Sequence, residues 1–139
     1  MKKLIFLLSL FAVCFTVQAQ QSSFPVKTVL LTTTSYGNRL DTVNNTASKV
    51  TTPVAVSGWH VGISAQVVVT KISGTVGGSI GLYGSVDGTN WSLVGSAQTP
   101  TDTTANYSFN TVIGWPYYQL KYTGTGTMSA SIKSSLSVY

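Results

Sequence analysis

The stretch Met128-Ser-Ala-Ser-Ile-Lys-Ser-Ser-Leu-Ser-Val-Tyr139 alternates between two kinds of side chain along its whole length. One set of alternate positions is mainly apolar: Met128, Ala130, Ile132, Leu136 and Val138. The other set is polar: Ser129, Ser131, Lys133, Ser135 and Ser137. A period of two is typical of a β-strand with one buried and one wet face, whereas a helix would spread the apolar residues around its axis. We therefore expect a strand that ties the C-terminus into a sheet.

The same period recurs upstream. Tyr118, Leu120 and Tyr122 alternate with two polar residues, and Gly124-Thr125-Gly126 then forms a short link of hairpin type to the last strand. A longer strand is expected to bury Val61, Ile63, Ala65, Val67 and Val69. Further strands are predicted over residues 24–33, 51–56 and 107–113, with Pro53 favouring an edge position for the second.

Asp87-Gly88-Thr89-Asn90 separates two apolar runs. Asp-Gly between such runs predicts a hairpin, because glycine tolerates the positive φ that these turns require. Trp91 restarts the pattern in phase with Leu93, which favours a core position for the tryptophan.

The polar stretch over residues 97–106 is predicted to be a loop. Residues 35–48 are rich in Asn, Thr and Gly, and their pattern predicts no particular element. Seven to nine short strands without helical periodicity indicate an all-β protein. The expected fold is a single antiparallel β-sandwich, either a jelly roll or immunoglobulin-like.

The N-terminus has the features of a signal peptide. Lys2 and Lys3 precede an apolar run over residues 4–17, and Val17-Gln18-Ala19 fits a cleavage site. We expect a signal peptide over residues 1–19 and a β-sandwich domain over 20–139, with no stable membrane insertion after cleavage. A retained anchor and lipidation at Cys14 are the alternatives. The expected location is secreted or cell-surface, and a periplasmic location is also open.

Residues 20–139 contain six basic and three acidic residues, a net charge of +3, and no cysteine. The charges are scattered, whereas a nucleic-acid site needs clustered Lys and Arg, so no nucleic-acid partner is expected. Without cysteine, stability must come from packing and from sheet hydrogen bonds.

Catalytic hardware is sparse. His60 is the sole histidine, and Asp41, Asp87 and Asp102 lie far apart in the sequence. No serine occupies a nucleophile elbow, and Asp87 and Asp102 fit turns better than a glycosidase carboxylate pair. We expect no enzyme activity, no cofactor and no metal site. Calcium at Asp87 and Asn90 stays open beside a plain hydrogen-bonded turn.

Aromatic side chains are the candidate binding residues. Trp115 and Tyr117 flank Pro116 after a glycine, and Tyr117 is out of phase with Tyr118. Together with Trp59 they could stack against a sugar ring; packing at the end of the sandwich is the alternative.

The segment Gly84-Ser-Val-Asp-Gly-Thr-Asn-Trp91 resembles a hairpin of discoidin-like domains and of β-sandwich proteins from phage and prophage virions. In the virion type, a segment similar to Tyr117-Tyr-Gln-Leu-Lys-Tyr-Thr-Gly-Thr-Gly-Thr127 and an alternating last strand follow. This resemblance covers roughly residues 60–139 and implies a fold rather than a function.

These features favour a secreted or cell-surface, non-catalytic structural or interaction module. The alternatives are a carbohydrate-binding module and a phage virion-associated structural protein. The expected partner is a protein or a surface glycan, and homo-oligomerisation is left open.

Overall fold

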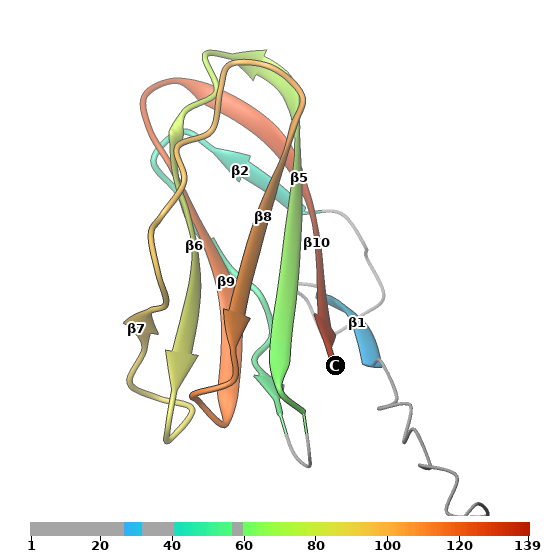
Figure 1. The fold of residues 1–139 in the computed structure, drawn as a ribbon. Helices are drawn as coiled ribbons and strands as arrows, with labels where there is room; N and C mark the ends of the chain where they lie inside the picture. Colours follow the sequence, from blue (N-terminus) through green and yellow to red (C-terminus); the bar gives the residue numbers. More distant parts are fainter. Residues whose placement is uncertain (1–26, 32–40, 57–59) are drawn as a thin grey trace, which may run out of the picture.

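The computed structural model describes residues 27–31, 41–56 and 60–139, and every regular element in these ranges is a β-strand (Figure 1). The strands are β1 (Lys27–Leu31), β2 (Asp41–Asn44), β3 (Ser48–Val50), β4 (Val54–Ala55), β5 (Gly62–Gly74), β6 (Gly78–Ser85), β7 (Ser92–Leu93), β8 (Ala105–Val112), β9 (Tyr117–Gly124) and β10 (Met128–Val138). The expected all-β class is confirmed.

Two antiparallel sheets of five strands face each other. Sheet A has the order β1-β10-β5-β8, with β2 also paired to β10, and sheet B has the order β3-β9-β6-β7, with β4 also paired to β9. β1 and β2 lie along successive parts of β10, and β3 and β4 lie along successive parts of β9. The ten strands therefore occupy eight positions, within the expected seven to nine.

The order of these positions is that of a jelly roll. Numbered along the chain, sheet A reads 1-8-3-6 and sheet B reads 2-7-4-5. Consecutive positions alternate between the sheets, except for the β6–β7 hairpin. An immunoglobulin-type sandwich would instead pair its first two strands within one sheet. The strand order thus selects the jelly roll from the two expected sandwiches.

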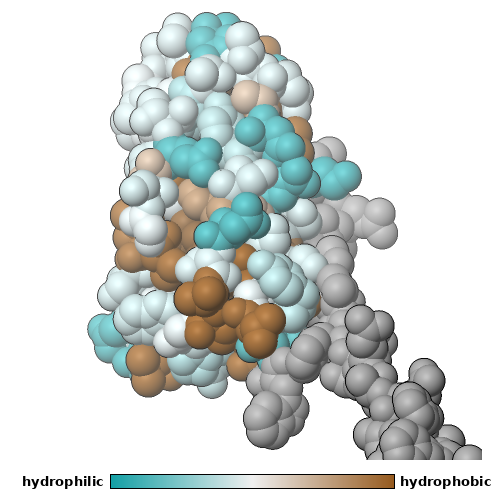
Figure 2. All heavy atoms as spheres, viewed as in Figure 1, coloured by the Kyte–Doolittle hydropathy of each residue, from teal (hydrophilic) through white to brown (hydrophobic). Residues whose placement is uncertain are grey.

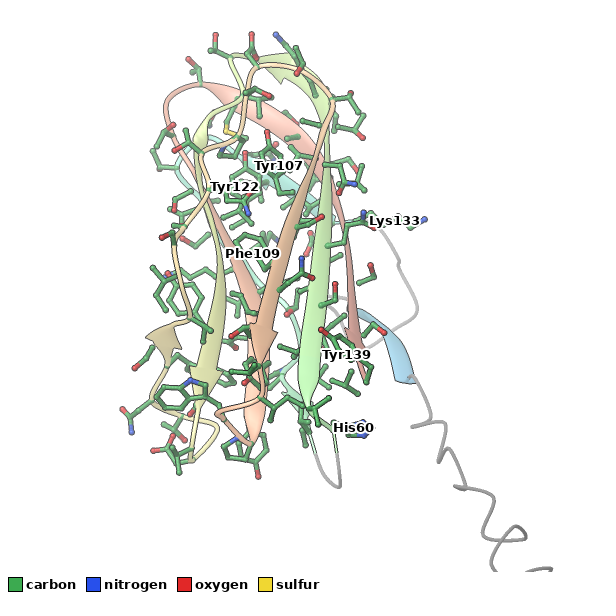
Figure 3. All side chains as sticks on the ribbon, viewed as in Figure 1. His60, Tyr107, Phe109, Tyr122, Lys133 and Tyr139 are labelled. Atoms are coloured by element: carbon green, nitrogen blue, oxygen red, sulfur yellow. The ribbon has the colours of Figure 1, made fainter. Side chains whose placement is uncertain are left out.

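The core lies between the sheets and follows the period-two patterns. β10 buries Met128, Ala130, Ile132, Leu136 and Val138, as predicted. β9 buries Tyr118, Leu120 and Tyr122, and β5 buries Ile63, Ala65, Val67 and Val69. Figure 3 shows Tyr107, Phe109 and Tyr122 in the space between the sheets. Pro53 separates β3 from β4 at the edge of sheet B, which confirms its predicted edge position.

Three expectations about individual segments are wrong. Gly124-Thr125-Gly126 does not close a hairpin, because β9 and β10 belong to different sheets and the link crosses from one sheet to the other. Val61 is 61% exposed, because β5 begins only at Gly62. Leu93 is 43% exposed and covers Gly81 on the outer face of sheet B. The phase that Trp91 shares with Leu93 therefore does not place the tryptophan in the core.

In residues 35–48, where the sequence pattern predicts no particular element, the described part contains the strand β2, whose Val43 is fully buried. The expected loop over residues 97–106 agrees with the structure as far as Thr104, and β8 begins at Ala105. No helix in residues 27–31, 41–56 and 60–139 is long and apolar enough to cross a bilayer.

Candidate binding site at the aromatic end of the sandwich

Three connections converge at one end of the sandwich, the lower end in Figure 1: β4–β5, β6–β7 and β8–β9. The amide of Val56 donates to the carbonyl of Pro116 at 2.8 Å, which joins the first and third connections. The second connection lies close to them, because an added Cβ on Gly88 would lie 3.9 Å from the ring of Tyr117. We call this region, with Trp91, Trp115 and Tyr117, the aromatic end.

The β6–β7 connection is organised by one carboxylate. Asp87 Oδ1 accepts hydrogen bonds from the amides of Thr89 and Asn90, both at 2.8 Å, and from Ser85 Oγ at 2.9 Å. Gly88 has φ +72°, as the Asp-Gly sequence predicts. The bonds from Asn90 and Thr89 hold the pKa of Asp87 well below its usual range, because they favour the charged carboxylate. The carboxylate of Asp87 is therefore charged at neutral pH, the form that accepts all of these hydrogen bonds.

The same bonds bear on calcium. Asn90 Nδ2 donates to Asp87 Oδ2 at 2.7 Å, so both carboxylate oxygens face N–H or O–H donors. A calcium ion needs free oxygen lone pairs and is repelled by donor hydrogens. This arrangement fits the hydrogen-bonded turn better than a cation site.

Trp115 packs inward from the β8–β9 connection. Its side chain is half-buried and packs against the hydrophobic core, and its ring approaches Gly84 so closely that an added Cβ there would lie 2.4 Å from Trp115 Cγ. The hydroxyl of Tyr118 accepts hydrogen bonds from the amides of Gly114 and Trp115, at 2.9 and 3.2 Å. Packing at the end of the sandwich, the alternative to an exposed tip, accounts for this residue.

Tyr117 has the more open position. It begins β9, is half-buried, and pairs with Ser85 and with Ala55 across sheet B. Its ring lies beside Gly88, with three ring atoms 3.9 to 4.0 Å from the added Cβ position. Its out-of-phase position therefore places it on the opposite side of the sheet from Tyr118, next to the Asp87 turn.

The other candidate residues are distributed as follows. Trp59 lies outside the described residues. His60 is half-buried just before β5, and its Nδ1 has no hydrogen-bond partner among the described residues (Figure 3). Lys49 Nζ lies 3.3 Å from Asp41 Oδ1, and Lys71 Nζ lies 2.8 Å from Asp102 Oδ2. Each acidic group outside the turn therefore has a basic neighbour. The described part of the chain contains no group of three His, Cys, Asp or Glu side chains that could hold a metal.

The sequence pattern did not lead us to expect that side chains cover the outer face of sheet B. Leu93 covers Gly81 there, and Lys121 Nζ lies 5.9 Å from the ring centroid of Tyr83, a cation–π distance. Gln119, which alternates with the buried Tyr118 and Leu120, is only 7% exposed. The alternation could have predicted this surface, because Tyr83 and Lys121 each directly follow a buried leucine and therefore point to the opposite face of the sheet.

Comparisons with known proteins show the fold alone. No family model matches the sequence, and no curated protein matches it. A chain in a structure of the T13 particle of infectious bursal disease virus has a TM-score of 0.54 and 12% identity, over 81% of this chain and 30% of that one. A chain in a structure of the Gt strain of the same virus gives 0.50 and 13%, over 83% and 32%. The protein thus spans about a third of the chains that it resembles. The likeness supports the virion-type resemblance at the level of the sandwich, and the discoidin-like resemblance stays an expectation.

Proposed function

We propose that this protein is an exported, non-catalytic structural module that acts by contact with other protein surfaces. The observation that carries the proposal is the jelly-roll strand order, which the protein combines with a likeness to chains from a virus particle. Jelly rolls serve as building blocks in viral capsids and as binding frames in lectins. Assembly or binding, rather than chemistry, is the use that this frame favours.

The outer face of sheet A supports a contact role. It is mainly polar, with Ser64, Gln66, Thr70, Asn106, Ser108 and Asn110, and it also carries the apolar Val68 and the charged Lys133. At the end of this face Val112 is 77% exposed. It pairs with Gly62, which the ring of the 43% exposed Tyr139 covers. Figure 2 shows hydrophobic surface near the lower end of the molecule. Charged residues are depleted at the centres of protein interfaces, because their desolvation is costly. A polar, weakly charged face with an apolar end meets that requirement.

The non-catalytic part of the proposal rests on how the ionisable groups are used. Asp87 accepts four hydrogen bonds within its own turn, and Asp102 binds Lys71 and the amide of Val76. A general acid or base needs a carboxylate whose pKa lies near the working pH, whereas these contacts lower the pKa of both groups. The contacts of Asp87 and Asp102 therefore favour a structural role for both carboxylates.

Cross-linking in the native host tests the proposal. Cells are treated with an amine-reactive cross-linker, and the adducts of this protein are identified by mass spectrometry, together with the N-terminus of the recovered chain. We expect an N-terminus at Gln20 and adducts with one or a few proteins. A lipidated start at Cys14 would contradict the expected export route, and an uncross-linked chain with hydrolytic activity lost in His60→Ala would contradict the structural role.

A carbohydrate-binding module is the second candidate, and the aromatic end favours it. Tyr117 is half-exposed beside the turn that carries Thr89 and Asn90, so an aromatic ring lies next to polar side chains able to bind hydroxyl groups. Binding to a glycan array that Tyr117→Ala abolishes and Tyr83→Ala preserves would establish this role. Tyr83 is the matched control because it is half-buried on the same sheet.

A further inference from the structure

β8 is the longest outer strand in the described part of the chain. It pairs with β5 along all eight of its residues, and no strand within residues 27–31, 41–56 and 60–139 lies along its other side (Figure 1). The other outer positions are short or broken: β7 has two residues, β3 and β4 are separated by residues 51–53, and β1 and β2 are separate strands. Sheet A therefore ends in an eight-residue edge with its own row of backbone donors and acceptors.

The backbone groups at this edge can be assigned from two hydrogen bonds. Gln98 Nε2 donates to the carbonyl of Ser108 at 2.7 Å, so the Ser108 carbonyl points away from β5. The amide of Ile113 donates to Val61 at 3.3 Å on the β5 side. Because backbone groups alternate along a strand, Asn106 and Asn110 present their amides and carbonyls on the same open side as Ser108.

This edge lacks the usual protection against strand pairing. Natural proteins guard outer strands with lysine, proline, bulges or short length. β8 has no charged residue, no proline and an unbroken register with β5. Its cover at the centre is the side-chain amide of Gln98, which a backbone amide can replace.

We propose that β8 pairs with β8 of a second copy of this chain, antiparallel, about a two-fold axis at Ser108. The pairing places Ser108 opposite its own copy and Asn106 opposite Asn110 of the second copy. This pairing rests on the proposed function and specifies its protein partner, which is a second copy of the chain. The two sheets A then form one continuous sheet, and the amide of each Ser108 takes the place of Gln98.

Charge favours a second copy over a different strand. In a two-fold pairing each side chain of β8 faces a side chain of a second β8. Such self-pairing is favourable only where like charges do not face each other. β8 is uncharged along all eight residues, so it offers no complementary charge to an acidic or a basic partner and no repulsion to itself. Closed two-fold dimers are also the commonest symmetric assembly.

Disulfide trapping tests the register. The full chain has one cysteine, so Cys14→Ala gives a background free of other thiols. Residues that exchange both backbone bonds across an antiparallel pair have Cα atoms about 5.5 Å apart, within the range that a disulfide spans. Under mild oxidation at micromolar concentration, Ser108→Cys should form covalent dimers at least ten times faster than Thr70→Cys. Thr70 is also exposed, but it lies on β5, an inner strand of the sheet. Equal rates for the two variants would overturn the proposal.

A charge variant gives a second, reversible measurement. Ser108→Lys puts two ammonium groups opposite each other at the axis, whereas Thr70→Lys adds the same charge away from it. Analytical ultracentrifugation should show a dimer for the wild type and for Thr70→Lys, and at least tenfold weaker association for Ser108→Lys. A wild-type monomer at all concentrations, or an unchanged dimer in Ser108→Lys, would contradict β8 pairing. If Ser108→Lys is monomeric yet keeps its adducts with other host proteins, the proposed function stands and the dimer is a separate property. If the purified protein forms the β8 dimer but the host gives adducts neither with a second copy nor with other proteins, the pairing stands and the proposed function fails.

Discussion

The buried hydroxyl of Tyr118 accepts a hydrogen bond from the amide of Gly114 at 2.9 Å. A core side chain thereby holds the backbone of a loop at the aromatic end. Tyr107 does the same elsewhere, with its hydroxyl accepting from the amide of Thr101 at 2.7 Å, and Tyr122 donates to the carbonyl of Gly77 at 3.0 Å. Three tyrosines therefore use apolar rings in the core and polar tips on the loops.

Tyr118→Phe should loosen the β8–β9 connection. The change leaves two part-buried amides without their acceptor, which costs about 1–3 kcal/mol of unfolding free energy. Urea unfolding measures the loss, and tryptophan fluorescence should report a changed environment for Trp115. Tyr139→Phe is the control, because Tyr139 is 43% exposed and surface changes usually stay within about 0.5 kcal/mol. Equal losses in the two variants would mean that the hydroxyl of Tyr118 does not hold the loop.

Two glycines should respond differently to the same substitution. Gly88 has φ +72°, whereas no positive φ is found at Gly114 and no atom lies near its added Cβ. Gly88→Ala should lower the unfolding free energy by about 1 kcal/mol or more, and Gly114→Ala should be neutral or raise it by up to about 1 kcal/mol. Thermal melts of the pair measure this difference. A stable Gly88→Ala variant would show that the Asp87 turn adopts another conformation.

Burial was predictable from the sequence wherever a strand was long. β10 and the middle of β5 follow strict alternation, because each covers the same core on one face along many residues. The pattern failed at Val61, just outside the strand, where the chain no longer has to keep its phase. Alternation could not predict that Gly124–Gly126 connects one sheet to the other. A short link between two strands of one sheet and a short link between two sheets require the same kinds of residue.

The aromatic end was harder to predict. Trp115 and Tyr117 come from the β8–β9 connection and the start of β9, whereas Trp91 comes from the β6–β7 connection. Only the jelly-roll order brings these two connections to one end. Local sequence placed Tyr117 out of phase correctly, but it could not show that Gly84 leaves room for the ring of Trp115. That contact depends on a glycine 31 positions earlier in the printed sequence, on another strand.

Acid should weaken the link between the β7–β8 and β5–β6 connections. Lys71 donates to Asp102 at 2.8 Å and the amide of Val76 donates at 2.6 Å, and these bonds lower the pKa of Asp102 below its ordinary value. A lowered folded pKa gives stability that is present above about pH 4, the unfolded pKa, and is lost as the pH falls through the folded pKa. Melting temperatures measured from pH 7 to pH 2 should therefore fall below about pH 4.

Asp102→Asn should melt at a lower temperature than the wild type at pH 7 and converge with it near the acid limit. The remaining acid dependence belongs in part to Asp87, whose pKa is lowered in the same direction. Lys133→Gln, at an exposed position on β10, should keep the wild-type pH dependence. Parallel curves for Asp102→Asn and the wild type would show that this carboxylate does not contribute.

Removal of residues 134–139 should unfold the protein. This segment of β10 pairs with β1 on one side and with β5 on the other, and it buries Leu136 and Val138. Each of those side chains contributes about 1.5–3 kcal/mol when fully buried, and the neighbouring strand loses its hydrogen-bond partners as well. Small domains have only about 5–15 kcal/mol of stability, so circular dichroism should show loss of the sheet signal or aggregation.

The contrasting variant combines Ser131→Lys with Ser135→Lys on the outer face of the same strand. Both serines are half-buried there, opposite the core face, so this variant should keep its sheet signal and melt within a few degrees of the wild type. A folded truncation would mean that the last six residues are dispensable for the sandwich. A collapsed lysine variant would mean that the outer face of sheet A is covered, because lysine ammonium groups are tolerated only where they can reach water.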